Sequence, residues 1–196
     1  DHHNCVFIGM DKNCVPRHAH KRGTYTLGES FKGNVDDCDS RYSFHYTGTS
    51  NRIYVFEAPI DMLSYITLHN DNWQEHSYVS LCSVADHALV QMLKDNPQIS
   101  KIYLCLDNDS AGIESEWRIR QHLNELGYRD ISFVRPKYKD WNEILKAQNG
   151  IEPLPAVPNP YLTNMRKLLQ ETMNSVMGSK PLLYPFKTLY ADYQRF

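Results

Sequence analysis

The sequence predicts an α/β fold with a parallel four-stranded sheet and helices on both faces. Four short apolar runs start at residues 53, 77, 101 and 130, and each is followed by a segment whose apolar residues recur at helical spacing. Strands that are apolar almost throughout indicate a sheet buried on both faces, which is typical of parallel strands joined by helices. The connections between them are expected to be right-handed.

Residues 1–50 precede this alternation and are predicted to form a small antiparallel β meander. The segment is rich in Gly, Asp, His and Tyr, and clusters such as Asp-Lys-Asn and Gly-Asn indicate tight turns. The predicted strands lie within CVFIGMD (5–11), RHAHKRGTYTL (17–27), SFKGN (30–34) and RYSFHYTG (41–48).

Residues 51–150 are predicted to form the main domain. Its strands are expected at IYVFEA (53–58), SYVSLC (77–82), KIYLCLD (101–107) and DISFVRP (130–136). Its helices are expected at 59–70, 85–96, 112–127 and 140–150, and Gly127 and Gly150 are suited to end the last two.

The C-terminal part of the chain has a different composition. IEPLPAVPNP (151–160) is predicted to be an extended, proline-rich linker. Residues 161–196 are predicted to form a helix and an aromatic tail. The helix is expected to dock on the body through apolar residues at helical spacing: Leu162, Met165, Leu168, Leu169, Met173 and Val176.

Bulk properties narrow the classes of function. The net charge of -2 and the pI of about 6.5 do not favour a broad basic surface, although a local basic patch is compatible with them. The five cysteines include no CxxC pair, which favours a reducing, cytoplasmic location. We find no signal peptide and no apolar run long enough for a bilayer, so no membrane partner is expected. Because the first residue is Asp1, a longer parent protein with further domains is expected.

Acidic residues stand at the ends of three of the predicted strands. Glu57 ends the first strand, Asp107 and Asp109 follow the third, and Asp140 with Asn142 follows the fourth. Ligands of parallel α/β sheets bind at the carboxyl ends of the strands. Residues two apart in extended chain point the same way, so the two aspartates converge and repel unless a cation is present. Oxygen ligands alone favour Mg²⁺ or Mn²⁺.

Glu57 is expected either to complete such a metal site or to move a proton. Asp61, one helical turn beyond it, is an outer-shell candidate, as are Asp140 and Asn142. The alternative interpretation of LDNDSAG is structural, because Asp109 or Ser110 is a good N-cap for the next helix. The three tryptophans, Trp73, Trp117 and Trp141, are expected to be packing residues, with Trp141 of interest because it adjoins Asp140.

A basic segment, RHAHKR, lies in the predicted meander. It is a candidate for contacting the phosphates of a nucleotide or nucleic acid, and equally for a solvated edge strand whose charges prevent aggregation. The phosphate-binding candidates are Arg17, His18, His20, Lys21, Arg22 and, in the main domain, Lys139.

Three segments of the predicted main domain together resemble the Toprim domain, which is found in bacterial-type primases, topoisomerases, some nucleases and recombination mediators. VFEAPIDMLS is similar to its first-strand signature, LDNDSAG to its DxD signature, and KDWNEIL to the closing segment of primase-like members. The resemblance covers about residues 51–149. Residues 1–50 resemble the end of an uncharacterised domain that precedes Toprim in proteins of plasmids and integrative conjugative elements.

The resemblance implies metal-dependent phosphoryl transfer or phosphodiester cleavage, with DNA or nucleotides as partners and other domains or replication proteins nearby. Asp107 and Asp109 would hold the metal, and Glu57 would be the general acid/base or third ligand. The first hypothesis is a primase-like activity. The alternatives are a nuclease and a catalytically silent binding module. Cys82 and Ser83 stand where the family often has a glycine, which favours the silent alternative. The oligomeric state stays open.

Overall fold

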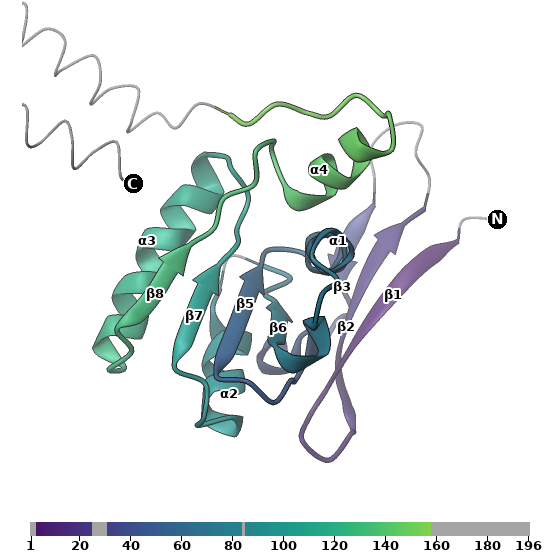
Figure 1. The fold of residues 1–196 in the computed structure, drawn as a ribbon. Helices are drawn as coiled ribbons and strands as arrows, with labels where there is room; N and C mark the ends of the chain where they lie inside the picture. Colours follow the sequence, from purple (N-terminus) through teal and green to yellow (C-terminus); the bar gives the residue numbers. More distant parts are fainter. Residues whose placement is uncertain (1–2, 25–30, 84, 158–196) are drawn as a thin grey trace, which may run out of the picture. The chain divides into compact units, whose positions relative to one another are not determined.

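The computed structural model describes residues 3–24, 31–83 and 85–157. Two sheets of three and five strands and four α-helices make up this part of the chain (Figure 1). No helix in these ranges is long and apolar enough to cross a membrane. The helix and tail predicted at 161–196, and the last residues of the predicted linker, lie outside the described residues.

The predicted N-terminal meander is confirmed. Its strands are β1 (Asn4–Met10), β2 (Pro16–Gly23) and β3 (Lys32–Asn34), antiparallel in the order β1-β2-β3. The β1–β2 turn is closed by the Asp11 carboxylate, which accepts the backbone N–H groups of Asn13 and Val15 at 2.9 and 3.1 Å. Such Asx contacts are why aspartate favours turns.

The main sheet holds the four predicted parallel strands and one more. Its strands are β4 (His45–Tyr46), β5 (Arg52–Phe56), β6 (Ser77–Ser80), β7 (Lys101–Leu104) and β8 (Asp130–Phe133), in the order β4-β6-β5-β7-β8. All pairs are parallel except β4 with β6.

Strand β4 comes from RYSFHYTG, which was expected in the meander and instead pairs with the main sheet. The Ser43 hydroxyl donates to the Ser80 carbonyl, and the Ser80 N–H donates to the Phe44 carbonyl at 3.0 Å. These contacts seat the segment beside β6, which would otherwise be an open edge. A short 3-10 helix, η1 (Ser40–Tyr42), leads into it, and a second, η2 (Trp73–Glu75), precedes β6.

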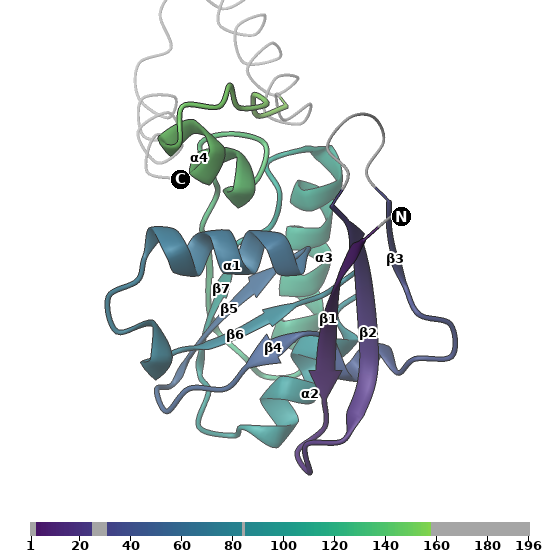
Figure 2. The ribbon, with the colours of Figure 1, turned by 90° about the vertical axis from the view of Figure 1, so that its right-hand side faces the viewer.

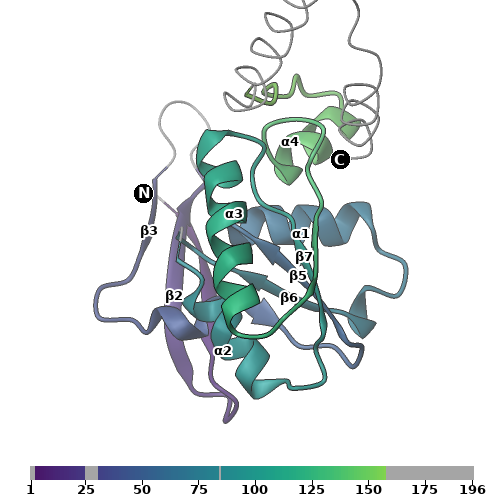
Figure 3. The ribbon, with the colours of Figure 1, turned by 90° about the vertical axis from the view of Figure 1, so that its left-hand side faces the viewer.

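Helices cover both faces of the main sheet, as predicted (Figures 2 and 3). They are α1 (Pro59–Leu68), α2 (His87–Asp95), α3 (Ser110–Glu125) and α4 (Trp141–Gln148). Alternate residues of β5 separate the two layers. Ile53 and Val55 lie in the core under α2 and α3, whereas Phe56 packs in the other core with Tyr65 of α1 and Trp141 of α4.

Candidate metal and nucleic-acid site

The carboxyl ends of β5 and β7 bring Glu57 and Asp107 into contact. The Asp107 N–H donates to Glu57 Oε1 at 3.3 Å. The first turn of α3 closes over the same point at Gly112, where a Cβ atom would lie 2.1 Å from the Asp107 carbonyl oxygen and 2.9 Å from Glu57 Oε1. Only glycine allows this approach, so the Gly of LDNDSAG is required by the packing of α3 against Glu57.

Asp109 is the N-cap of α3, and Ser110 is the first helical residue. Asp109 Oδ1 accepts the Gly112 N–H at 3.0 Å. Asp107 makes no such contact: its Oδ1 is buried and has no hydrogen-bond partner in the described part of the chain. The two aspartates therefore differ, since one carboxylate caps a helix while the other leaves an acceptor unpaired next to Glu57.

The three outer-shell candidates meet where α1 packs on α4. Pro59 starts α1 soon after Glu57, which places Asp61 in the first turn. Asp61 is 4% exposed, and its Oδ1 accepts the Asn142 N–H at 3.1 Å. Asp140 caps α4 by accepting the Glu143 N–H at 2.8 Å. The side chains thus hold two helix starts beside the strand ends.

We call Glu57, Asp61, Asp107, Asp109 and Asp140 the acidic cluster. Burial, and repulsion from Asp61 and Glu57, raise the pKa of Asp107 to about 9. Burial and the charge of Asp140 raise the pKa of Asp61 to about 7. Burial likewise raises the pKa of Glu57 and of Asp140. Without a cation the acidic cluster therefore retains protons that isolated carboxyls would release at neutral pH.

The chemistry of the acidic cluster fits a hard divalent cation, although no ligand cage is preformed. Within residues 3–24, 31–83 and 85–157, no three His, Cys, Asp or Glu side chains are already arranged to hold a metal. The donors are all oxygens, Asp107 Oδ1 has no partner among the described residues, and burial together with repulsion from neighbouring carboxylates raises the pKa of Asp107. Glu57, Asp107 and Asp109 would hold the ion, with Asp109 offering the oxygen that its cap does not use.

The predicted basic segment splits between the two sides of β2. His18 and His20 are 3% and 7% exposed, and His20 Nδ1 lies 2.7 Å from Asn34 Oδ1. Burial lowers the pKa of His18. Arg17, on the opposite side, pairs with Asp11 at 2.8 Å. The histidines are thus packed inside, and Arg17 is occupied by the β1–β2 turn.

Three cations stand near the acidic cluster. Arg22 lies on β2 directly opposite Lys32 of β3, and its charge acts to lower the pKa of Asp61. Burial raises the pKa of Glu57, and Lys32 and Lys139 act against that rise. Lys21 instead lies over the Phe31 ring, 5.7 Å from its centroid. Sequence reasoning missed Lys32, which sits in a three-residue strand with no pattern of its own.

Cys82 occupies the position where the sequence suggested a missing glycine. Its φ of 53° lies in the left-handed region that favours glycine. The Cys82 N–H donates to the Glu57 carbonyl at 2.9 Å, and Asn34 Nδ2 donates to the Cys82 carbonyl at 3.4 Å. The backbone turn is therefore retained with a side chain on it, and it links β3 to the strand end that carries Glu57.

The tryptophans divide into buried and exposed residues. Trp141 is 5% exposed and its Nε1 donates to the Cys105 carbonyl at 2.9 Å, so it packs the core as predicted. Trp117 is 58% exposed on α3, and its predicted packing role is wrong. Glu143 is buried too, but it binds Lys146 at 2.7 Å and the Leu154 N–H at 2.7 Å, which gives it a structural role.

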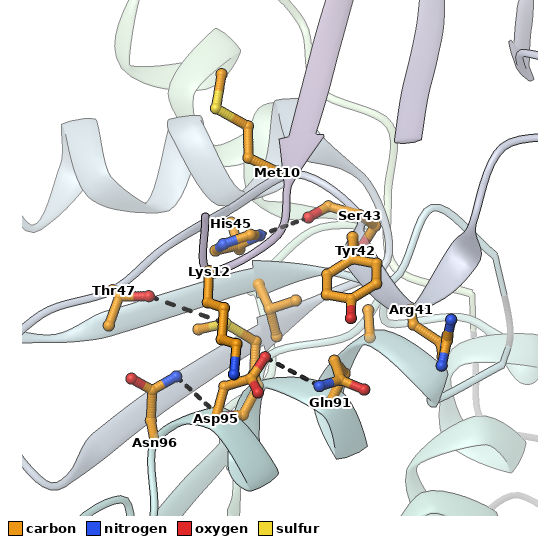
Figure 4. A pocket seen from close by; sticks show the side chains of 13 residues that line it. Met10, Lys12, Arg41, Tyr42, Ser43, His45, Thr47, Gln91, Asp95 and Asn96 are labelled. Carbon is orange, nitrogen blue, oxygen red and sulfur yellow. Dashed lines mark hydrogen bonds between the residues drawn. The ribbon is translucent and has the colours of Figure 1, made fainter. Parts of the chain in front are cut away.

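A separate pocket of about 230 Å³ lies between the β1–β2 turn, η1, β4 and α2 (Figure 4). Lys12, Arg41, His45 and Asp95 are among the residues that line it. No member of the acidic cluster contributes to its wall. The pocket is therefore not part of the site at the strand ends.

Two family models match the sequence, one over the main domain and one over the N-terminal meander. Residues 54–145 match a family model described as Toprim-like, and residues 1–50 match a model described as a protein of unknown function, DUF3991. Residues 54–145 thus match a Toprim-like domain. The resemblance inferred from VFEAPIDMLS, LDNDSAG and KDWNEIL is thereby confirmed, as is the uncharacterised domain before it.

The chain matches part of two longer curated relatives. The uncharacterized protein pXO2-78 of Bacillus anthracis is 25% identical over 158 residues, which are 72% of this chain and 44% of that protein. The uncharacterized protein MG010 of Mycoplasma genitalium is 29% identical over 102 residues, 51% of this chain and 44% of its own length. The chain thus spans less than half of these relatives.

Two solved structures share the fold. The primase fragment of the bacteriophage T7 primase-helicase protein superposes with a TM-score of 0.54 at 20% identity, covering 74% of this chain and 58% of that one. The Aquifex aeolicus primase, with its zinc-binding and RNA polymerase domains, gives 0.54 at 15% identity over 72% of this chain and 36% of that one. At these identities the likeness concerns the fold.

Proposed function

We propose that this Toprim-like domain is a Mg²⁺- or Mn²⁺-dependent, primase-like phosphoryl-transfer enzyme that acts on DNA or nucleotides. The observation that carries the proposal is that Glu57, Asp107 and Asp109 stand together at the carboxyl ends of parallel strands, with raised pKa values for Glu57 and Asp107. The primases of bacteriophage T7 and Aquifex aeolicus, which share the fold, support it. A mobile genetic element, the cytoplasm and further replication domains are the proposed setting.

Each residue has a proposed part. Asp107 and Asp109 hold the ion with Glu57, and the bound ion supplies charge neutralisation at a phosphate. Glu57 is the general acid/base, because burial raises the pKa of its carboxyl above the ordinary value and so favours its holding a proton. Asp61, Asp140 and Asn142 keep the two helix starts in place around the ion.

The proposed phosphate contacts come from cations beside the acidic cluster. Arg22 and Lys139 are the proposed phosphate-binding residues, together with Lys32. Arg22 and Lys32 face each other across two strands, and like charges in that position repel. An anionic phosphate between them removes the repulsion, which is why we assign them to the substrate.

Two alternatives use the same residues. A Toprim nuclease needs the same metal ligands with water as the nucleophile. A catalytically silent binding module is favoured by Asp109, which already serves as a helix cap, and by Cys82 on a backbone suited to glycine.

The deciding experiment incubates the chain with end-labelled single-stranded DNA, nucleoside triphosphates and Mn²⁺. Extension supports the primase-like proposal, shortening supports the nuclease, and unchanged DNA supports the silent module. Calorimetry with Mg²⁺ and Mn²⁺, wild type against Asp107→Ala/Asp109→Ala, tests the ion itself. Absence of binding by the wild type would overturn every metal-dependent form of the proposal.

A further inference from the structure

Helix α3 runs beside the edge strand β8 (Figure 1). Aromatic rings and an arginine from these two elements contact one another. Trp117 is 58% exposed and meets the Phe133 ring edge-to-face, with the centroids 5.7 Å apart. The guanidinium of Arg120 lies over both rings, 5.7 Å from the Trp117 centroid and 5.4 Å from that of Phe133. A tryptophan this exposed adds little to the core, so its place needs another explanation.

Arg120 is held by rings and not by an acid. Within the described residues it forms no ion pair or hydrogen bond with a carboxylate, and its contacts are the two cation–π interactions. Cation–π contacts orient the flat guanidinium without using its N–H donors. Arg120 is therefore ordered in advance and still able to bind a phosphate.

Aromatic and basic residues also alternate in the segment that leads from β8 to the acidic cluster. In FVRPKYKD, Arg135 lies 5.9 Å from the Phe133 centroid and Lys137 lies 5.3 Å from that of Tyr138. The charge of Arg135 is balanced by buried Glu116 at 2.6 Å, so Arg135 acts here mainly as a flat surface. The run ends beside the acidic cluster, where the Lys139 carbonyl accepts the Asn108 N–H at 2.7 Å.

We propose that Trp117, Arg120, Phe133, Arg135, Lys137 and Tyr138 form a track that binds single-stranded nucleic acid and leads it to the acidic cluster. Rings interleaved with cations bind unpaired bases by stacking and phosphates by charge, without sequence preference. The surface is too rich in cations for an apolar protein interface, and it concentrates positive charge in a chain whose net charge is -2. The choice of nucleic acid as occupant rests on the proposed function.

The test measures anisotropy of a fluorescein-labelled thymidine 15-mer, about the length that one binding module covers, in EDTA. Trp117→Leu is expected to weaken binding about 5- to 100-fold, because the ring that stacks is lost. Trp117→Phe keeps a ring and should stay within about 3-fold of the wild type. Equal affinity of the Leu and Phe variants would overturn stacking, and unchanged binding in both would overturn the track.

Salt dependence tests the cations. Arg120→Ala/Lys137→Ala should lower the slope of log affinity against log salt by about 1.4, since each phosphate contact on a single strand contributes about 0.7. The control, Arg52→Ala/Lys94→Ala, removes the same charge from exposed positions elsewhere and should leave the slope unchanged. An equal loss of slope in both variants would mean general electrostatic attraction and would overturn the track.

These outcomes separate the track from the catalytic proposal, because EDTA removes the ion. Weakened binding in Trp117→Leu, together with inert DNA in the Mn²⁺ assay, would support the track and count against the enzyme. If the DNA is extended or cleaved and Trp117→Leu binds it as tightly as the wild type, the enzyme is supported and the track is wrong. If Trp117→Leu instead alters self-association in sedimentation while DNA affinity is unchanged, the surface is a protein interface and the track is wrong.

Discussion

The backbone amide of Asp107 donates to Oε1 of Glu57 at 3.3 Å, although the two residues are 50 positions apart in the sequence. The bond fixes one carboxylate oxygen by a main-chain group, so side-chain rotation cannot release it without cost. In the part of the chain that the structure describes, the buried Oδ1 of Asp107 has no hydrogen-bond partner. The carboxylate of Glu57 is thus held in place, whereas that of Asp107 keeps an oxygen available for a ligand.

Gly112→Ala should break this arrangement. The added Cβ would lie 2.1 Å from the Asp107 carbonyl oxygen, a backbone atom that cannot move aside alone. We expect a loss of about 2 to 3 kcal/mol in the free energy of unfolding, measured by urea denaturation, and weaker Mg²⁺ binding in calorimetry. Gly33→Ala is the matched control, because its Cβ meets nothing within 4 Å. Equal destabilisation by both variants would contradict the close packing of α3 on Glu57.

Asp107→Asn should stabilise the metal-free protein at high pH. Its pKa is raised to about 9 in the folded state from the ordinary value of 3.8, so the folded state binds the proton more tightly. The wild type therefore loses stability as pH rises from about 4 to about 9, and the variant avoids this loss. We expect a gain of about 1 to 3 kcal/mol at pH 8 and none at pH 3.5, by urea denaturation at each pH. Saturating Mg²⁺ should narrow the difference, and a gain independent of pH would contradict the prediction.

Cys82→Gly and Cys82→Ala should differ although both remove the thiol. The φ of 53° is unstrained for glycine and strained for alanine. We expect the glycine variant to be about 1 kcal/mol more stable than the alanine variant in denaturation. If alanine were the more stable, the left-handed backbone at this turn would be disproved. Higher activity of Cys82→Gly in the Mn²⁺ assay would also count against the silent module.

Lys32→Ala should weaken nucleotide binding and not metal binding. Its charge acts on Glu57 from across the site, and Arg22 stands opposite it. We expect the KM for a nucleoside triphosphate to rise about 5- to 20-fold, since a charged contact of about 1 to 2 kcal/mol is lost. Lys12→Ala, an exposed lysine beside the separate pocket, should leave the KM unchanged. A fall in kcat with constant KM would show that Lys32 acts on the ion or Glu57 instead.

The parallel strands and the positions of Glu57 and Asp107 could be predicted because each strand is a continuous apolar run, and its end follows from the sequence. Strand β4 could not be predicted, since two residues carry no period and their partners in β6 lie 32 and 34 positions away. Burial of His18 and His20 could not be predicted either. Alternation in β2 assigns residues to two faces but does not indicate which face packs against the core. Exposure of Trp117 escaped prediction because a tryptophan at helical spacing usually packs inward.

The cap at Asp109 has a thermodynamic consequence. The carboxylate that would bind the cation also secures the first turn of α3, and Trp117 lies on that same helix. Such a cap contributes about 1 kcal/mol to a helix. A cation that draws on Asp109 therefore changes the free energy of the helix that carries the track. By reciprocity, nucleic acid that steadies α3 changes the affinity for the cation by the same factor.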